Sequence, residues 1–150
     1  MIYKDRKLSD IEEKAKKTQG DTFLPKDIDV SILKTIPYEY PKNRIKVSLQ
    51  TAEFTCLCPF SGLPDYAQLT IVYVPYKKLI ELKSLKYYLY AFRSVKVYNE
   101  HAVNKIMEDL KHILSPREIT VEAEFTSRGG ITNKVTASYV SKRDRISKPR

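Results

Sequence analysis

The sequence predicts one α+β domain in which two strands, two helices and two further strands follow one another. The first two and the last two segments carry the alternating or β-rich pattern of strands, whereas the two central segments have apolar residues at helical spacing. The chain has 150 residues, of which 42% are hydrophobic, which is enough for the core of a single domain. We expect an antiparallel sheet with both helices on one face.

The first two strands are expected at residues 44–50 and 68–76. Apolar and polar residues alternate across the first segment, and the second is rich in β-branched and aromatic residues until Pro75. The two strands should pair antiparallel as a long hairpin. Its connection is FTCLCPFSGLPD, residues 54–65, which holds both cysteines of the chain.

The two helices are expected from apolar residues three or four positions apart. One such stripe runs from Leu82 to Phe92, and a second runs from Val103 to Leu114 behind Asn99, a residue type favoured as an N-cap. Both stripes should pack on the sheet.

The last two strands are expected at residues 118–125 and 133–140, on either side of the SRGG turn at residues 127–130. An open four-stranded sheet has two edges with unpaired backbone groups. We therefore expect neighbouring subunits to continue the sheet into a ring or barrel.

The domain should occupy residues 42–140, with an N-terminal arm at residues 1–41 and a basic tail at residues 141–150. Prolines interrupt the arm, and a capping-box spacing at residues 9–12 favours one short helix there. Five basic residues and one aspartate at the end of the chain contribute +4 of the formal net charge of +9. This composition is typical of a disordered tail.

Composition also narrows the class of protein. No apolar run approaches the roughly 18 residues of a membrane helix, and the N-terminus lacks the apolar stretch of a signal peptide, so we expect a soluble, cytoplasmic protein with no membrane partner. The positive charge leaves a basic RNA-binding module as an open alternative. Cys56 and Cys58 are too close to form a useful disulfide loop, and zinc would need His101 or His112, so no metal site is expected.

Cys58 and Asp65 form a candidate catalytic pair. A thiolate is a strong nucleophile, and a nearby carboxyl group can return a proton to an intermediate. Pro59 and Pro64 stiffen the interval and Gly62 lets it turn back, so the two side chains can meet at the mouth of the hairpin. The alternative is a buried loop cysteine beside an aspartate that bonds to its own turn.

Two further features can be interpreted either as functional or as purely structural. Lys83, Lys86, Tyr90 and Arg93 share one face of the first helix, which can hold phosphate or can simply be solvated. Glu100, in the first turn of the second helix, is either favoured there by the helix dipole or available to accept N–H donors from a ligand.

Four motifs in this order, FTCLCPFSGLPD, IELKSLKYYLYAFR, NEH and FTSRGGI, resemble the NADPH-dependent nitrile reductases that convert 7-cyano-7-deazaguanine to 7-aminomethyl-7-deazaguanine in queuosine biosynthesis. The resemblance covers roughly residues 40–140. It implies the tunnelling fold, a ββααββ unit assembled into pentameric rings that can stack as a decamer, with active sites between subunits. GTP cyclohydrolases share this fold, so an enzyme acting on GTP or a pterin is the alternative.

The resemblance implies roles for individual residues. Cys58, directly before proline, is similar to the family's nucleophile, and Asp65 of the PD pair is similar to its proton donor. Glu100 corresponds to the glutamate that recognises the base, beside Asn99, where the family usually has histidine. Arg128 corresponds to a cofactor-binding arginine.

The ELKSLK motif is the other part of the implied site. Ile80, Glu81 and Leu82 should line the base pocket, while Lys83 and Lys86 should contact the phosphates of NADPH. The implied reaction is thiolate addition to the nitrile carbon, protonation of nitrogen, hydride transfer to the thioimide and a second hydride transfer to the imine. The covalent adduct is needed because a nitrile is a poor hydride acceptor.

Overall fold

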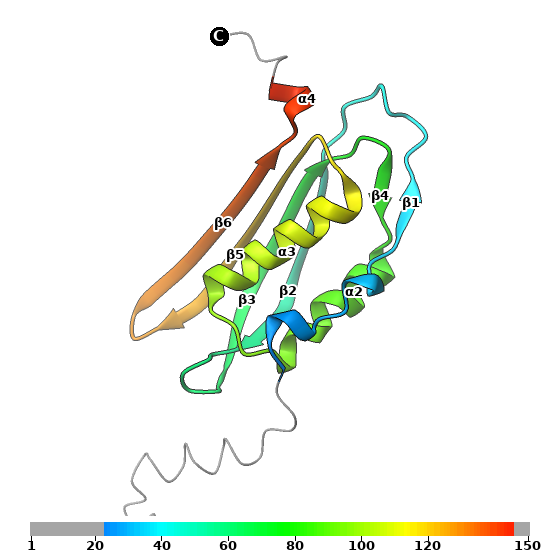
Figure 1. Cartoon of the computed structure of the whole chain (residues 1–150). Helices are drawn as coiled ribbons and strands as arrows, with labels where there is room; N and C mark the ends of the chain where they lie inside the picture. The colour runs from blue at the N-terminus through cyan, green and yellow to red at the C-terminus, as the bar shows by residue number, and fades with distance from the viewer. Residues whose placement is uncertain (1–22, 146–150) are drawn as a thin grey trace, which may run out of the picture.

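The computed structural model describes residues 23–145, and at its centre lies a four-stranded antiparallel sheet in the order β2, β3, β5, β6 (Figure 1). The strands are β2 (Val47–Leu57), β3 (Pro64–Val74), β5 (Glu118–Arg128) and β6 (Ile131–Val140). Helices α2 (Leu82–Ala91) and α3 (Asn99–Leu114) lie on one face of this sheet. The predicted α+β class and ββααββ order are confirmed.

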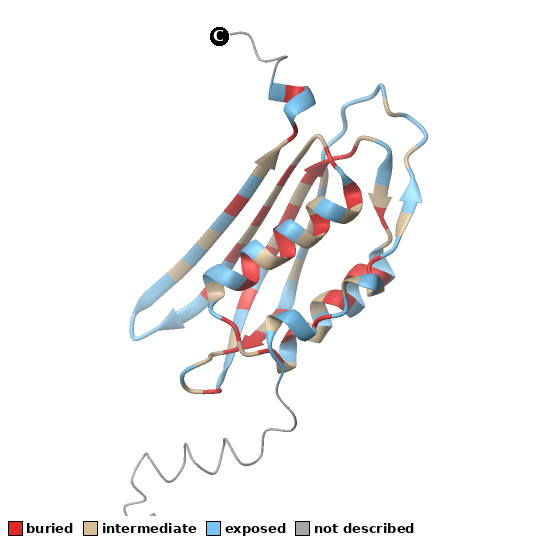
Figure 2. Ribbon diagram, viewed as in Figure 1, coloured by how far each residue is buried: buried red, intermediate tan, exposed pale blue. Residues whose placement is uncertain are grey.

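The core lies between the sheet and the two helices (Figure 2). Along β3 and β5 every second side chain is buried, among them Ile71 and Val121, while the residues between them are more exposed. Phe92 packs against Phe54 and Tyr88, with ring centroids 5.4 and 5.5 Å apart respectively. This aromatic cluster joins β2 to the end of α2.

The β2–β3 hairpin is longer than the sequence predicts. β2 continues through Leu57 and β3 begins at Pro64, so FTCLCPFSGLPD contains two strand ends and only residues 58–63 form the loop. Leu57 pairs with Pro64, and Cys56 pairs with Asp65. Because Pro64 is the first residue of its strand, its missing N–H does not interrupt the ladder.

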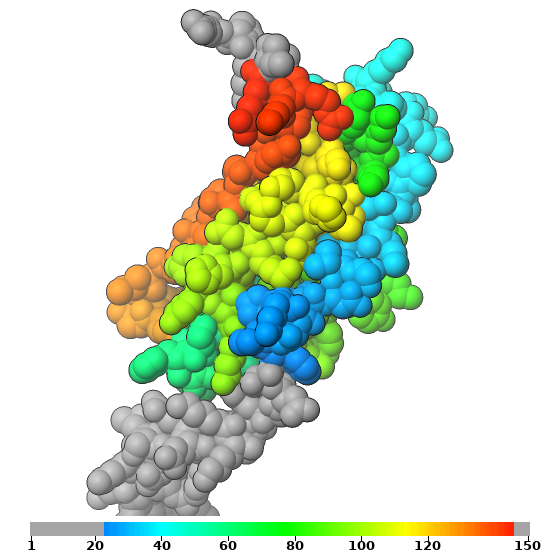
Figure 3. Space-filling model, viewed as in Figure 1, coloured from blue at the N-terminus to red at the C-terminus, as the bar shows by residue number. Residues whose placement is uncertain are grey.

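Several short elements connect the residues before β2 to the rest of the domain, and no sequence pattern predicted them. They are η1 (Pro25–Asp27), η2 (Val30–Ile32), β1 (Thr35–Pro37), β4 (Lys78–Ile80) and η3 (Phe92–Ser94). β1 pairs with β4, and Ile28 and Leu33 are buried in the core. Figure 3 shows the beginning of this segment, in blue, lying against the helical layer. The helix expected at residues 9–12 lies outside the described residues.

A short helical turn, α4 (Lys142–Arg145), follows β6 where the sequence predicted a disordered tail. The buried Asp144 carboxylate accepts hydrogen bonds from Arg44 at 2.8 Å, Arg117 at 3.2 Å and the Ser141 hydroxyl at 2.6 Å. The one acidic residue of this basic turn therefore anchors it to two arginines from distant parts of the chain.

The β5–β6 hairpin closes through Gly129 and Gly130, and Arg128 pairs with Ile131 across the turn. The two glycines have φ of 59° and 78°, as both central positions of a type I′ turn require. The turn thereby determines where Arg128 and the first residues of β6 lie at the end of the sheet.

Replacing Gly130 with alanine should lower the free energy of unfolding by about 1–2 kcal/mol, because a Cβ is disfavoured at positive φ. A Cβ built there meets no atom within 4 Å, so the loss comes from the backbone alone. Gly130→Asn is the matched control and should lose less, since asparagine tolerates this conformation. Urea denaturation at equal protein concentration measures both changes. An alanine variant as stable as the parent would contradict the turn assignment.

Candidate active site

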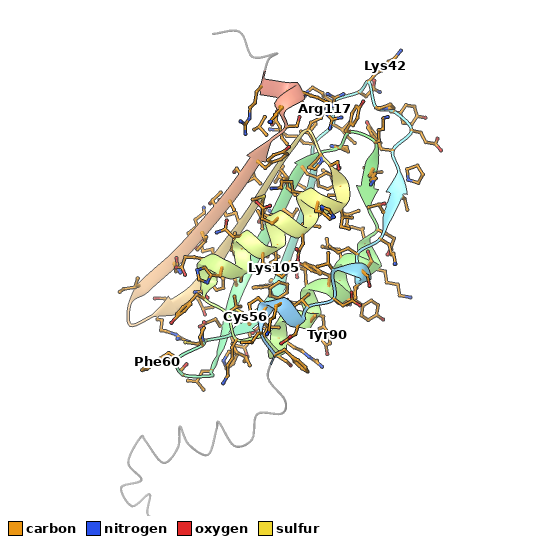
Figure 4. The ribbon with its side chains drawn as sticks, in the orientation of Figure 1. Lys42, Cys56, Phe60, Tyr90, Lys105 and Arg117 are labelled. Carbon is orange, nitrogen blue, oxygen red and sulfur yellow. The ribbon has the colours of Figure 1, made fainter. Side chains whose placement is uncertain are left out.

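A cavity of about 330 Å³ lies where the β2–β3 loop, the start of α3 and the β5–β6 hairpin meet. In Figure 4, Cys56 and Phe60 mark this end of the molecule, away from Lys42 and Arg117. The cavity is lined by Cys58, Pro59, Asp65, Tyr98, Asn99, Glu100, Phe125, Thr126, Arg128, Ile131 and Asn133. Five residues that the sequence singled out therefore share one cavity: Cys58, Asp65, Asn99, Glu100 and Arg128.

Backbone pairing brings the start of α3 to the cysteine loop. Leu57, the last residue of β2, donates its N–H to the Val95 carbonyl at 2.9 Å and accepts a hydrogen bond from the Val97 N–H at 3.0 Å. The segment before α3 thus runs beside the end of β2. Asn99 and Glu100 follow directly, which places them across the cavity from the loop.

The β2–β3 loop surrounds the Cys58 sulfur with hydrogen-bond donors. Burial raises the pKa of the Cys58 thiol, but donors outweigh this effect and lower the pKa to about 7. The donors are the hydroxyl and backbone N–H of Ser61, the backbone N–H of Phe60 and the side chain of Arg128. Ser61 Oγ also accepts the Leu63 N–H at 3.2 Å, which leaves its hydrogen free for the sulfur. Cys58 is therefore partly thiolate near neutral pH.

Cys56 lies in a different environment although it is only two residues away. It is fully buried on the core side of β2 and is not in a disulfide. Burial, followed by the negative charges of Asp65 and Cys58, raises the pKa of the Cys56 thiol to about 12. Of the two thiols, only Cys58 has the character of a nucleophile.

Arg128 contacts both members of the candidate catalytic pair. Its Nη2 lies 2.5 Å from Asp65 Oδ1, and its side chain is also a donor to Cys58. The Asp65 side chain is 15% exposed and that of Arg128 is 56% exposed, so the arginine keeps one side open to solvent. One guanidinium therefore joins the thiol and the carboxyl group of the candidate pair.

Asn99 and Glu100 present oxygen acceptors at the other side of the cavity. Asn99 is the first helical residue of α3, one position after the N-cap that the sequence predicted it to be. Its Oδ1 is buried and has no hydrogen-bond partner among the described residues, so it is available to a donor from a ligand or water. Glu100 Oε1 accepts a hydrogen bond from Asn133 Nδ2 at 3.1 Å.

Comparison with known proteins identifies the family. A sequence model of the QueF-like protein family matches residues 64–144. The NADPH-dependent 7-cyano-7-deazaguanine reductase of Caldicellulosiruptor bescii is 48% identical over 127 residues, which cover 85% of this chain and 97% of the relative. The reductase of the same name from Thermoanaerobacter pseudethanolicus is 46% identical over 127 residues, covering 85% of this chain and 96% of the relative. The chain belongs to the QueF-like family.

A solved structure supports the family fold. The crystal structure of the archaeosine synthase QueF-Like in the apo form matches with a TM-score of 0.56 and 17% sequence identity, over 63% of this chain and 91% of that chain. At this identity the likeness concerns the fold, which agrees with the tunnelling fold that the sequence predicted.

The ELKSLK residues of this family member lie outside the cavity. Glu81 caps α2, because its carboxylate oxygens accept the backbone N–H groups of Lys83 at 2.9 Å and Ser84 at 2.7 Å. These two hydrogen bonds lower the pKa of Glu81. Ile80 is buried in the core. The ten-residue α2 is about 15 Å long, and its opposite end leads through η3 to Val95, which accepts the N–H of Leu57.

Leu82 and Lys86 instead line a second cavity of about 410 Å³ between α2 and the edge strand β2. Its walls are mainly apolar and include Leu85 and Leu89. Lys83 and Lys86 are exposed and form no ion pair with any described residue. Arg93, placed on the same face by the sequence pattern, stacks on the Tyr90 ring with its guanidinium carbon 3.9 Å from the centroid.

Sequence reasoning missed several residues of the candidate site. Ser61 lies in the quoted loop, and its hydroxyl could have drawn attention as a donor to the cysteine. Tyr98 directly precedes the NEH motif, and Ile131 and Asn133 follow SRGG. Closeness to these motifs in the sequence was the one signal that could have indicated a place in the site. Within residues 23–145, no group of three His, Cys, Asp or Glu side chains is placed to hold a metal ion, and no helix is long and apolar enough to span a membrane.

The pKa of Cys58 can be tested by alkylation with iodoacetamide. The rate should rise with pH through a midpoint near 7, because only the thiolate reacts. Ser61→Ala removes one donor and should raise the midpoint, with a rate at neutral pH about threefold lower. Ser61→Thr keeps the hydroxyl and should retain the parent profile. Cys58→Ala should abolish labelling, whereas labelling of Cys56 in that variant at neutral pH would contradict the assignment of the two thiols.

Proposed function

We propose that this chain is an NADPH-dependent oxidoreductase that reduces the nitrile of 7-cyano-7-deazaguanine to 7-aminomethyl-7-deazaguanine, in tRNA queuosine biosynthesis, through a covalent thioimide. The observation that carries the proposal is the Cys58 thiol with a pKa of about 7, which shares one cavity with Asp65 and Glu100. Relatives that carry this activity in their names are 46–48% identical across 85% of the chain. A reduced nucleophile of this kind also fits the cytoplasm, which we propose as the location.

Cys58 begins the reaction by adding its thiolate to the nitrile carbon. One π bond of the nitrile breaks, a carbon–sulfur bond forms, and negative charge develops on the nitrogen. A proton on that nitrogen completes the thioimide, whose carbon accepts hydride more readily than the nitrile did. Collapse of the reduced adduct breaks the carbon–sulfur bond, leaves an imine and returns the thiolate to Cys58, where the hydrogen bonds of the loop stabilise it. A second hydride to the imine carbon and a proton to its nitrogen then give the primary amine.

Asp65 supplies the proton that the nitrogen needs. Since Asp65 is ion-paired with Arg128, it first accepts a proton, and the Cys58 thiol in the same cavity can provide it. This transfer generates the nucleophile and the acid together. Asp65 thus acts as a base before the thiolate adds to the nitrile and as an acid afterwards.

Glu100 and Asn99 bind the base of the substrate. The guanine-like edge carries adjacent N–H donors, and a carboxylate oxygen together with the unpartnered amide oxygen of Asn99 can accept them. Asn99 stands where the resemblance implies a histidine, and its amide oxygen is a neutral acceptor that does not titrate. Recognition by this residue should therefore be independent of pH between about 5 and 8.

The cationic residues fit the phosphates of NADPH, which supplies the hydride when it is bound. Lys83 and Lys86 are exposed and unpaired among the described residues, and Arg128 keeps an open side. A mainly apolar cavity lies beside Lys86. Lys83, Lys86 and Arg128 would hold the phosphates.

Two copies of the chain are needed to bring all these residues together. Within one chain α2 separates Glu81, Leu82 and Lys83 from the Cys58 cavity. Among the described residues, the outer edges of β2 and β6 have no partner strand, apart from Leu57, which pairs with residues 95–97. We propose a ring, pentameric as in the family, in which the base pocket of one copy is completed by residues 80–82 of its neighbour. Because the Ile80 side chain is buried in the core of its own copy, only its backbone would line that pocket.

NADPH oxidation at 340 nm tests the reaction. Addition of 7-cyano-7-deazaguanine should consume two NADPH per nitrile, because four electrons separate a nitrile from a primary amine and each hydride carries two. Cys58→Ala should abolish this consumption, while Cys56→Ala should keep most of it. One NADPH per nitrile, or equal loss in both variants, would rule out the mechanism as written.

Mixing of inactive variants tests the shared site. Cys58→Ala and the double variant Lys83→Ala, Lys86→Ala should each be inactive at low NADPH, yet a mixture that is dissociated and reassembled should recover activity. If subunits assort at random, about a quarter of the interfaces carry both intact parts. Recovery to that level indicates a site made by two copies, whereas an inactive mixture of correctly reassembled oligomers indicates a site within one chain.

A further inference from the structure

Asn133 makes a contact with the candidate site that no motif indicated. It lies near the start of β6, directly opposite Phe125 of β5, and its Nδ2 donates to Glu100 Oε1 at 3.1 Å. It also lines the cavity that contains Cys58. A side chain of one hairpin thus holds the carboxylate that begins the neighbouring helix.

Glu100 depends on this contact for its orientation. Its carboxylate is exposed, and Asn133 is its hydrogen-bond partner among the described residues. A glutamate with three rotatable bonds otherwise samples many rotamers, and fixing them when a ligand binds costs conformational entropy. Asn133, in contrast, lies in a strand whose register is set by the ladder with β5 and by the tight turn at Gly129 and Gly130.

We propose that Asn133 is a positioning residue that holds Glu100 in the orientation that receives the base of the substrate. This inference rests on the proposed function of Glu100. Asn133 engages one carboxylate oxygen and leaves Oε2 available to the ligand. An amide suits this task because it donates to Glu100 at every pH at which the protein is folded, without adding charge.

The same geometry determines which ligand edge fits. One N–H of Asn133 Nδ2 is donated to Glu100, and the acceptors that remain at this wall include Glu100 Oε2 and the buried Oδ1 of Asn99. Acceptors at these positions favour a base edge with adjacent N–H donors. Asn133 therefore contributes to specificity through the orientation of Glu100.

Steady-state kinetics with 7-cyano-7-deazaguanine test this role. Asn133→Ala should raise the KM for the nitrile about five- to tenfold, with kcat and the KM for NADPH within about twofold of the parent. Asn133→Asp is nearly isosteric, so it should fold, but its charge repels Glu100 and should raise the KM further. Thr132→Ala, at an exposed neighbouring position of β6, is the control and should match the parent. An unchanged KM in Asn133→Ala would overturn the proposal.

A double-mutant cycle separates positioning from direct contact. In a Glu100→Ala background, Asn133→Ala should change the KM for the nitrile by less than about twofold, because the residue acts through Glu100. The same five- to tenfold increase in that background would mean that Asn133 touches the substrate itself, and the positioning role would be wrong.

Crystal structures of the substrate-free Asn133→Ala variant and its parent give a readout that does not require turnover. The Glu100 carboxylate should leave its position in the variant and stay in place in Thr132→Ala. If the parent fails to reduce the nitrile, the proposed function falls, yet this comparison still decides the positioning role. A Glu100 carboxylate that keeps its place without Asn133 would refute it.

Discussion

The pairing of Leu57 with Pro64 is the constraint on which the candidate site depends. It forces the chain to reverse within a short loop, and that reversal turns the N–H and hydroxyl of Ser61 back onto the sulfur of Cys58. The same register fixes Asp65 at the mouth of the hairpin. The proposed nucleophile and its proposed proton carrier are therefore placed by the strand register and by the backbone hydrogen bonds that close the loop, from the Cys58 N–H to the Leu63 carbonyl and from the Gly62 N–H to the Cys58 carbonyl. The Arg128 side chain, from the β5–β6 hairpin, then completes this group by contacting both residues.

Arg128 resolves an electrostatic conflict at this site. Cys58 and Asp65 can both carry negative charge, and each would raise the free energy of the other's charged form in a cavity with restricted access to water. The guanidinium contacts both and offsets this repulsion. In the proposed mechanism, transfer of the thiol proton to Asp65 moves one negative charge from oxygen to sulfur beside the same cation, so the total charge of the three groups does not change. Activation of the thiol then requires no ion to enter from solvent.

The sequence predicted those parts of the fold that a periodic pattern can encode, and its errors have physical causes. The apolar stripe of α3 marked the helix within one residue, since Asn99 is its first residue and not its cap. The length of β2 escaped prediction because the ladder shifts register between Thr51 and Phe54, which breaks the alternation. Cys58 and Asp65 could be paired from the sequence because one hairpin carries both. The contact of Asn133 with Glu100 could not, because it joins two elements that only the folded sheet brings together.

The topology of the sheet also constrains how copies of the chain can associate. In the order β2, β3, β5, β6 with every neighbour antiparallel, the two edge strands run in opposite directions. When β6 of one copy lies beside β2 of the next, the new ladder is therefore antiparallel, like those within the chain. This contact is heterologous, since different edges meet, and each addition exposes another free edge. In the proposed ring, twist and curvature must bring the last copy back to the first, and only then does no edge remain free.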